Sequence, residues 1–502
     1  MRAFVRCACR LNTRFGPVRR IHGSAVHRGD EDASVFPESL QKTLEAHRTS
    51  NRASLVRMVP SGSRGKSRGE AQSTDDDGGS GDKGGRKVAQ RASSRSSRGL
   101  DSREWEYREG RQDSRRWGRG VEPAKRQSPW LSRYPAHVRQ GDAMAHLDAE
   151  IHALDEYLTP TAYEKGRIKQ LAASISDAVG AVAHPPQLIG SWRTGLAICY
   201  SGLDFVLPVQ DDKDAGDGFR KPSANRPKVL EKRQRVLQDV GHALEQTRLF
   251  VKTASLPTTQ SPTTILTMNH IPTSLEVRFV SGEGPPPLTE YIEDYLAEYP
   301  SIRPLYRTVR LLLDSHGLFS AQSSSLTPTA LVMLLVALCK MNHGRFFQRA
   351  DSLGEQLLAF LHTYSSVDLI TTGVAIDPPG WFNHDTVQKQ LDTLHGSRLD
   401  IPAHLRGQRA LINLKRNAAH RSNIPIADHL CIQDPANYLN DLGFSCKRTR
   451  DLQHAWRHAY NRLNTAMNEW EVKPDVKKSV LGYGLLTNLD GFEKRREVLL
   501  SS

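Results

Sequence analysis

The sequence predicts an α+β fold in which a small mixed sheet with helices is followed by an all-α half, and in which the N-terminal region is basic and disordered. Short apolar runs and an alternating segment at 274–279 indicate strands between residues 181 and 290. From about residue 288 onward, apolar residues recur at helical spacing. Before residue 140, aliphatic residues are scarce. The chain has 502 residues, which is long enough for two or three domains.

The first 30 residues have the composition of a targeting segment. Residues 1–30 contain seven arginines, no lysine and a single acid, Asp30. An Arg-rich, acid-poor segment with interspersed apolar residues is typical of an amphipathic mitochondrial presequence. We therefore expect a transit peptide and a location in the mitochondrial matrix. The alternative is a basic disordered tail.

Residues 31–140 consist mainly of Ser, Gly, Arg and Asp. Such a segment buries too little apolar surface to offset the entropy of the chain, so we expect a disordered basic linker. Aromatic residues lie among arginines towards its end, namely Trp105, Tyr107, Trp117 and Trp130. They suit either stacking on single-stranded bases or a plain solvated linker.

Composition excludes some classes of function. The formal net charge of +14 favours an anionic partner, above all nucleic acid. The six cysteines are scattered and form no CxxC pair, which argues against a disulfide framework and against a zinc site. The apolar run at 331–339 is too short to span a membrane, so no membrane span is expected.

Helical spacing predicts the elements on both sides of the sheet. A helical lead-in occupies 141–180 and a further helix is expected at 228–251, after a polar loop at 211–227. Beyond the sheet everything is predicted as helix, and the segment 327–340 is apolar nearly all round, which predicts the core helix of the all-α half. The remaining helices are expected at 288–298, 301–316, 350–364, 405–420 and 449–470.

The stretch 187–209 is the strongest candidate for a functional site. An apolar pair leads into Gly190 and Ser191, and a second apolar run follows Gly202 and Asp204. A glycine at a strand end lets backbone N–H groups approach a phosphate, and the second strand carries a carboxylate. An ordinary turn at Gly190–Ser191 is the alternative.

These residues resemble the nucleotidyltransferases of the DNA polymerase β type, and most closely the non-canonical poly(A) polymerases of the mitochondrial type. That family has Gly-Ser on one side and a Ser-Asp-x-Asp strand start on the other, and the spacing from Gly190 to Gly202 matches. The resemblance covers about 155–470. It implies a nucleotidyltransferase palm at 181–290, a helical poly(A) polymerase-associated domain at 291–475 joined by the lead-in at 141–180, and a C-terminal tail at 476–502.

Two segments of the helical half extend the resemblance. The segment 302–318 is similar to the helix that carries a basic residue to the nucleotide phosphates, a role implied here for Arg310. The segment 431–443 is similar to a family motif near the base pocket, which implies nucleotide contacts for Asp434 and Asn440. Gly190 and Ser191 are likewise implied to bind the nucleotide.

The carboxylates that such an enzyme needs are incomplete. Adding a nucleotide to an RNA 3′ end uses two divalent ions about 4 Å apart, usually held by three carboxylates on neighbouring strands. Asp204 keeps one of these positions, but Gly202 offers no ligand. Depending on the register of 275–279, the third position holds Glu276 or Arg278. Asp204 and Glu276 are therefore the candidate catalytic and metal-binding residues.

The resemblance implies a mitochondrial RNA-binding protein of the poly(A) polymerase type, with weak or absent catalysis. Thr329 stands where the family places an aromatic residue that stacks on the base, and a threonine cannot stack. One alternative is an active terminal adenylyl- or uridylyltransferase in RNA 3′-end processing, which uses Mg²⁺ or Mn²⁺ with ATP; without activity no cofactor is expected. Another is a structural or assembly factor of the mitochondrial ribosome or of the RNA-degradation machinery, with a protein partner.

Overall fold

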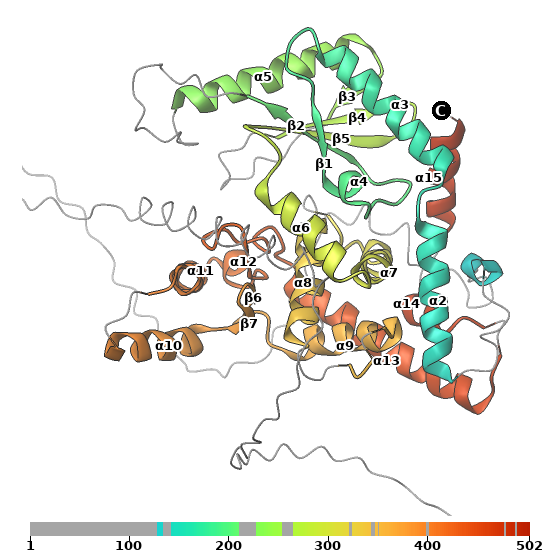
Figure 1. The fold of residues 1–502 in the computed structure, drawn as a ribbon, viewed down its shortest axis with the longest axis vertical. Coiled ribbons are helices and arrows are strands. Elements are labelled where there is room, and N and C mark those ends of the chain that lie inside the picture. Colours follow the sequence, from blue (N-terminus) through green and yellow to red (C-terminus); the bar gives the residue numbers. More distant parts are fainter. Residues whose placement is uncertain are drawn as a thin grey trace, which may run out of the picture. The chain divides into compact units, whose positions relative to one another are not determined.

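The computed structural model of the chain is shown in Figure 1. All of its described residues belong to the compact unit Ala46–Ser502, and the statements below concern that unit. The described residues are 128–133, 142–209, 227–253, 265–320, 324–342, 347–349, 351–397, 401–475, 478–486 and 489–501. The expected presequence, most of the expected linker, and the acids of the 211–227 loop lie outside these ranges.

The larger sheet is mixed, as predicted, and its strands follow the order β1-β2-β5-β4-β3. Strands β2 and β5 are parallel and the other neighbouring pairs are antiparallel. The strands are β1 (Gln187–Ile189), β2 (Leu203–Pro208), β3 (Phe250–Lys252), β4 (Ile265–His270) and β5 (Leu275–Gly282).

One face of this sheet is covered by helices. Leu275, Val277 and Phe279 on β5 are buried, whereas Glu276 and Arg278 between them remain partly exposed. Helix α5 (Pro227–Gln246) contacts β4 and β5, and α3 (Ala162–Val179) contacts α5 (Figure 1). The period-two alternation therefore puts the charged residues of β5 on the face opposite the buried apolar residues.

The helix predicted at 228–251 is too long. Helix α5 ends at Gln246, and the residues that follow form the edge strand β3. Phe250 is buried in this strand, and it pairs with His270 of β4. The short strand was missed because it has only three residues, too few to show a period.

The core of the helical half is α8 (Pro328–Met341), as the sequence predicts. Every residue from Ala330 to Leu338 is buried. Thr327 caps the helix, since its hydroxyl accepts a hydrogen bond from the backbone N–H of Ala330, and Pro328 occupies the first turn. The surrounding helices are α6 (Pro287–Glu298), α7 (Ile302–Ser315), α9 (Leu353–Ser366) and α13 (Thr449–Val472).

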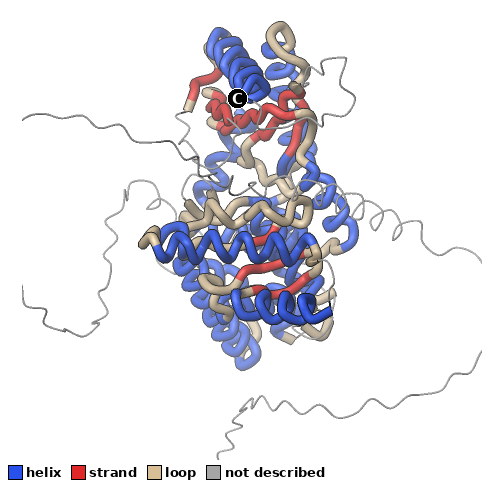
Figure 2. Tube along the Cα trace, turned by 90° about the vertical axis from the view of Figure 1, so that its left-hand side faces the viewer, coloured by secondary structure: helices blue, strands red, loops and turns tan. Residues whose placement is uncertain are grey.

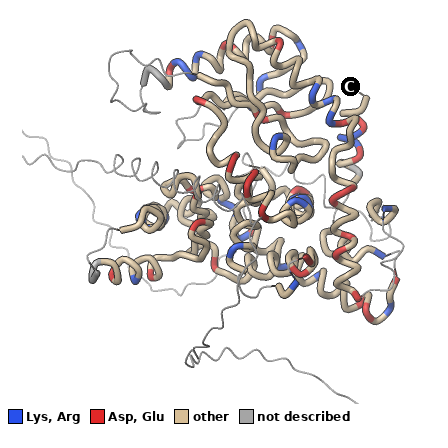
Figure 3. The backbone as a smooth tube through the Cα atoms, viewed as in Figure 1, with Lys and Arg blue, Asp and Glu red and all other residues tan. Residues whose placement is uncertain are grey.

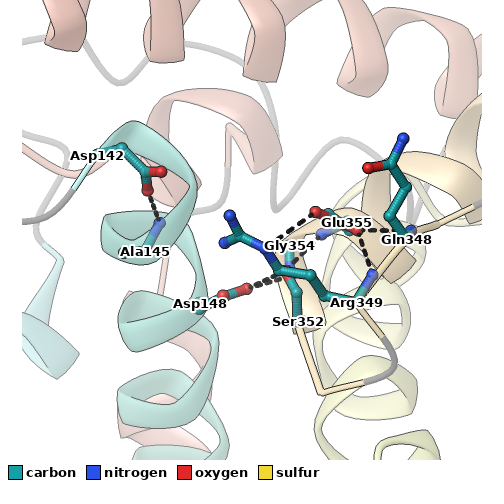
Figure 4. A network of polar contacts seen from close by, with 8 residues as sticks. All are labelled: Asp142, Ala145, Asp148, Gln348, Arg349, Ser352, Gly354 and Glu355. Atoms are coloured by element: carbon teal, nitrogen blue, oxygen red, sulfur yellow. Dashed lines mark hydrogen bonds and ion pairs between the residues drawn. The ribbon is translucent and has the colours of Figure 1, made fainter.

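Helix α2 (Ala143–Leu158) is joined to α9 by a polar network (Figure 4). The Asp148 carboxylate accepts hydrogen bonds from the Ser352 hydroxyl at 3.0 Å and from the Gly354 N–H at 2.6 Å. Burial raises the pKa of Asp148, while these hydrogen bonds oppose the rise. The start of α9 is thereby satisfied by a residue about two hundred positions earlier in the chain.

The prediction that everything beyond the first sheet is helical is wrong. A second sheet has the order β7-β6-β8, and Figures 1 and 2 show it apart from the first sheet. The segment 377–430 contributes α10 (His384–Ser397), α11 (Ala403–His420) and α12 (Ile424–Ala427) around it. The strands are β6 (Gly373–Ile376), β7 (Pro379–Phe382) and β8 (Ile432–Gln433). Strands of two to four residues leave no readable alternation, which is why helical spacing dominated the prediction.

The segment expected to be a C-terminal tail contains two packed helices, α14 (Val480–Leu485) and α15 (Asp490–Ser501). Helix α14 packs on α13 and α2, and α15 contacts α3. Arg496 of α15 forms an ion pair with the buried Glu164 of α3 at 2.6 Å. The end of the described chain is therefore part of the fold.

A short part of the segment 31–140, which was expected to be disordered, forms a packed helix. The short 3-10 helix η3 (Pro129–Arg133) packs against α2, and Trp130 is only 1% exposed. The indole N–H of Trp130 donates to Glu150 at 3.2 Å. A buried ring cannot stack on a base, so Trp130 belongs to the core and not to a nucleic-acid surface.

The state of the cysteines and the presence of membrane-spanning helices can be examined in the described residues. The free thiols there are Cys199, Cys339, Cys431 and Cys446. Among the helices of the described ranges, none combines the length and the apolar character that crossing a membrane requires.

Candidate functional site

The Gly-Ser turn lies directly against Asp204. Strand β1 ends at Ile189, which pairs with Asp204 of β2, and the chain then enters the short helix α4 (Gly190–Thr194). Gly190 has a φ of 71°, a left-handed conformation that glycine adopts without strain. A Cβ atom at Gly190 would lie 2.4 Å from Oδ2 of Asp204. The structure thus brings Gly190, Ser191 and Asp204 together at one end of the sheet.

Replacing Gly190 with alanine is expected to lower the free energy of unfolding by about 1–3 kcal/mol, because the new methyl group would displace the Asp204 carboxylate and the backbone would be strained. Urea unfolding measures the change. The matched control is Gly166→Ala in helix α3, where a Cβ would meet nothing within 4 Å. There alanine should be neutral or stabilise by up to about 1 kcal/mol. Equal effects of the two substitutions would contradict the contact.

The register of β5 puts Arg278 beside Asp204. In the parallel pair β2–β5, Asp204 is aligned with Arg278, and Leu203 is aligned with Val277. Nη2 of Arg278 lies 2.7 Å from Oδ1 of Asp204, and Nε of Arg278 lies 3.4 Å from Oε1 of Glu276. One guanidinium group therefore forms ion pairs with both candidate metal ligands.

Burial disfavours the charged form of Asp204, and Arg278 partly offsets this effect. Burial raises the pKa of the Asp204 carboxyl, the Arg278 guanidinium lowers it through its charge and hydrogen bond, and Glu276 raises it. The net shift is upward. The carboxylate is thus stabilised mainly by Arg278, since burial disfavours its charged form.

Within the described ranges, the residues around Asp204 do not fit a two-metal centre. Gly202 lies next to Glu276, because a Cβ at Gly202 would be 3.0 Å from the Glu276 carbonyl oxygen and 3.6 Å from its Cβ. The position that would add a carboxylate is therefore a glycine, and the position level with Asp204 is an arginine. Among the described residues, no group of three or more His, Cys, Asp or Glu side chains could hold a metal ion.

Two arginines of α7 donate hydrogen bonds to backbone carbonyls at the end of the turn. Arg303 donates to the Thr194 carbonyl at 2.8 Å, and Arg307 donates to the Gly195 carbonyl at 2.7 Å and also pairs with Asp155. These carbonyls lie at the C-terminal end of α4, where a helix leaves them without partners. Neither arginine was predicted as a site residue from the sequence; their spacing with Arg310, at i, i+4 and i+7, was the available signal.

Arg310, the expected phosphate contact, is buried in the protein interior. Its Nη1 donates to the Ser201 hydroxyl at 2.8 Å, and its Nε donates to Asp314 at 3.4 Å. The guanidinium carbon lies 5.6 Å from the centre of the Tyr200 ring and 5.1 Å from that of Phe319. The residue is only 7% exposed, so its charge faces these partners.

A further ion pair joins the turn to helix α6. Arg193 of α4 donates to Glu293 through Nε at 2.8 Å and through Nη2 at 3.2 Å. Helix α6 also carries Glu290, Asp294 and Glu298, and its acids are visible in Figure 3. Burial, followed by repulsion from these glutamates, raises the pKa of Asp294. The helix beside the Gly-Ser turn is therefore acidic.

Asp434 and Asn440 lie in a turn of the helical half, after β8. The Asn440 side-chain amide donates to Asp434 at 2.8 Å, and the Ala436 N–H donates to the other Asp434 oxygen at 2.8 Å. Asp434 is 5% exposed, and burial raises its pKa while these hydrogen bonds lower it. The two residues thus stabilise the turn that they belong to.

Comparison with known proteins supports the architecture. The sequence matches no protein-family model and no curated protein. The structure is similar to the polymerase core of TRAMP, an RNA surveillance complex, with a TM-score of 0.52, 18% identity, and coverage of 71% of this chain and 98% of that chain.

Two weaker similarities accompany it. Terminal uridylyl transferase 4 from Trypanosoma brucei with bound GTP gives a TM-score of 0.44 at 13% identity, covering 69% of this chain and 99% of that one. mtPAP in its apo form gives 0.47 at 12% identity, covering 73% of this chain and 78% of that one. With its mixed sheet and its surrounding helices, the chain shares the α+β fold of the TRAMP polymerase core, and an α+β fold is what the sequence predicted.

Proposed function

We propose that the chain is an RNA-binding protein with a nucleotidyltransferase fold that does not itself add nucleotides. The observation that carries the proposal is the position of Arg278, whose guanidinium forms ion pairs with both Asp204 and Glu276.

The chemistry of nucleotide addition explains why the ion pairs of Arg278 argue against catalysis. One divalent ion lowers the pKa of the attacking hydroxyl and the other neutralises the triphosphate, and both need hard oxygen ligands at close range. A guanidinium stays protonated at accessible pH and brings one positive charge in place of four. It also uses the carboxylate oxygens that the ions would need. In this site the carboxylates that could bind metal ions instead form ion pairs with an arginine of the protein.

The arginines around the turn are also engaged by the protein. Arg193 is paired with Glu293, and Arg307 is paired with Asp155. Arg310 is buried against Ser201 and Asp314. A triphosphate needs cations that are free to meet it, and these three groups already have partners. We therefore expect the turn to bind a nucleoside triphosphate weakly, in addition to lacking a set of metal ligands.

RNA is the proposed ligand on two grounds. The formal net charge of +14 favours a polyanion. The fold is shared with the polymerase core of a complex described as acting in RNA surveillance. Neither ground depends on catalysis, so the binding function is separable from the chemistry.

A nucleotide-incorporation assay tests the proposal. The purified chain is incubated with end-labelled oligo(A), each of the four nucleoside triphosphates in turn, and Mg²⁺ or Mn²⁺. We expect elongation no greater than that given by the Asp204→Ala variant, while the oligonucleotide is retarded in a mobility-shift gel.

The outcomes separate the alternatives. Elongation that Asp204→Ala abolishes would overturn the non-catalytic proposal and establish an active transferase that uses Asp204. Absence of any gel shift, with single-stranded and with duplex RNA, would overturn the RNA-binding proposal.

A further inference from the structure

Helix α11 presents a basic face to solvent on the side opposite its packed face. Its packed face includes Gln408, which donates to Gln433 of β8, and Leu411, which lies in a buried cluster with Val387 and Leu391 of α10. The exposed side chains on the other side follow helical spacing and continue to the residue after the helix. We call this surface the basic face of α11; it consists of Arg409, Asn413, Arg416, His420 and Arg421, all exposed.

Within the part of the chain that the structure describes, no ion pair neutralises the arginines of this face. The sequence from 401 to 427 contains no Asp or Glu. Among the described residues, Arg409, Arg416 and Arg421 take part in no ion pair, and Asp428, the first acid after the segment, is paired with Arg450. These arginines contrast with Arg193, Arg278 and Arg307 near the Gly-Ser turn, whose charges have partners inside the protein.

The spacing of the face suits a chain of phosphates. Arg409 and Arg416 are seven residues apart, which corresponds to about 10 Å along the helix. The side chains between and beside them on the same side, Asn413 and Asn417, are exposed amides that donate and accept hydrogen bonds. Arginine forks recognise phosphate oxygens in pairs, and asparagine contributes sugar and phosphate contacts.

The composition favours nucleic acid over a protein partner. The core of a protein interface is normally apolar or aromatic. The exposed large apolar residue of α11 is Leu414, at 39% exposure, and Ile424, at 56%, is the first residue of the following helix α12. No aromatic residue occurs in 401–427.

We infer that the basic face of α11 binds the phosphodiester backbone of RNA, at a surface distinct from the Gly-Ser turn. The inference rests on the proposed RNA-binding function and assigns that function a location. It also gives a role to the segment 377–430, whose sequence offered none.

The test compares two triple variants of the full chain that remove the same charge. In one, Arg409, Arg416 and Arg421 are each replaced by glutamine. In the matched control, the exposed Lys165 and Lys169 of α3 and Lys494 of α15 are replaced by glutamine. All six side chains are exposed, so both variants should keep the circular dichroism spectrum and melting temperature of the unmodified protein.

Binding to a single-stranded RNA is then measured by fluorescence anisotropy over a range of salt concentrations. Loss of three phosphate contacts should reduce the slope of log K against log salt by about 2, and should weaken binding at least about tenfold at low salt. The control variant should bind like the unmodified protein. Crosslinks from thiouridine-substituted RNA should map to peptides from 403–421.

Each result decides the inference. Equal affinity of the two variants, with RNA binding intact, would overturn the assignment to α11 and leave the proposed function standing. Absence of RNA binding by the unmodified protein would remove both. If the unmodified protein bound polyglutamate as tightly as RNA, the face would accept acidic polymers in general, and the assignment to RNA would fail.

Discussion

Replacing Glu150 with alanine is expected to lower the free energy of unfolding by about 3–5 kcal/mol, because it removes the acceptor for several buried donors at once. Glu150 of α2 is fully buried. Its oxygens accept from the Val480 N–H at 2.7 Å, from the Trp130 indole N–H at 3.2 Å and from the Ser479 hydroxyl. Nε2 of His146 lies 2.9 Å from the same carboxylate. The Glu150 side chain therefore connects α2 to η3 and to α14 through hydrogen bonds.

The loss is measured by urea and thermal unfolding of the full chain. The matched control is Glu156→Ala, on the same helix, where the side chain is 70% exposed and its partner is Arg133. An exposed pair of this kind contributes about 1 kcal/mol or less. If both substitutions cost the same, Glu150 does not hold these elements together.

Residues whose pattern repeats locally were predictable. Helix α8 followed from apolar residues on all sides, and strand β5 followed from the alternation around Val277. The closeness of Gly190 and Asp204 was implied by the family resemblance, whose two motifs lie within one stretch of the chain. In each case the information lies within about twenty neighbouring residues, where period and turn chemistry act.

Contacts between distant segments were not predictable. Glu150 and Val480 are separated by 330 positions, and nothing local marks a buried glutamate as an anchor. Glu276 and Arg278 lie on the same face of a strand, so a register shift of two residues leaves the apolar pattern unchanged. Only the pairing of β2 with β5 determines that the arginine lies beside Asp204.

The contacts of the α7 arginines inside the protein were also not predictable. A basic residue on an amphipathic helix is normally solvated, and Arg310 matched a phosphate-binding position by resemblance. In the structure its guanidinium lies between two rings and donates to Ser201. Burial of an arginine against hydrogen-bond partners is a tertiary property, and sequence spacing does not reveal it.

Restoring carboxylates by the double substitution Gly202→Asp and Arg278→Asp should make the stability of the protein depend on divalent ions. Without metal, two added carboxylates would lie beside Asp204 and Glu276 with no cation between them, and we expect a loss of about 2–4 kcal/mol from like-charge repulsion. Gly202 has room for a side chain if the neighbouring Glu276 backbone, 3.0 Å from the new Cβ, moves by a few tenths of an ångström. Mn²⁺ at a hundredfold excess over its dissociation constant should then return about 2.7 kcal/mol.

Thermal unfolding with and without Mn²⁺ measures this gain, and the unmodified protein should show none. Adding Asp204→Ala to the double variant should reduce the response, because a shared ion loses one of its ligands. In both proteins a positive charge then lies between the strands: a guanidinium in the unmodified protein and a metal ion in the double variant. If Mn²⁺ stabilised the unmodified protein as much as the double variant, the guanidinium would not be occupying the place of the ion, and the ion pairs of Arg278 could no longer explain a lack of catalysis.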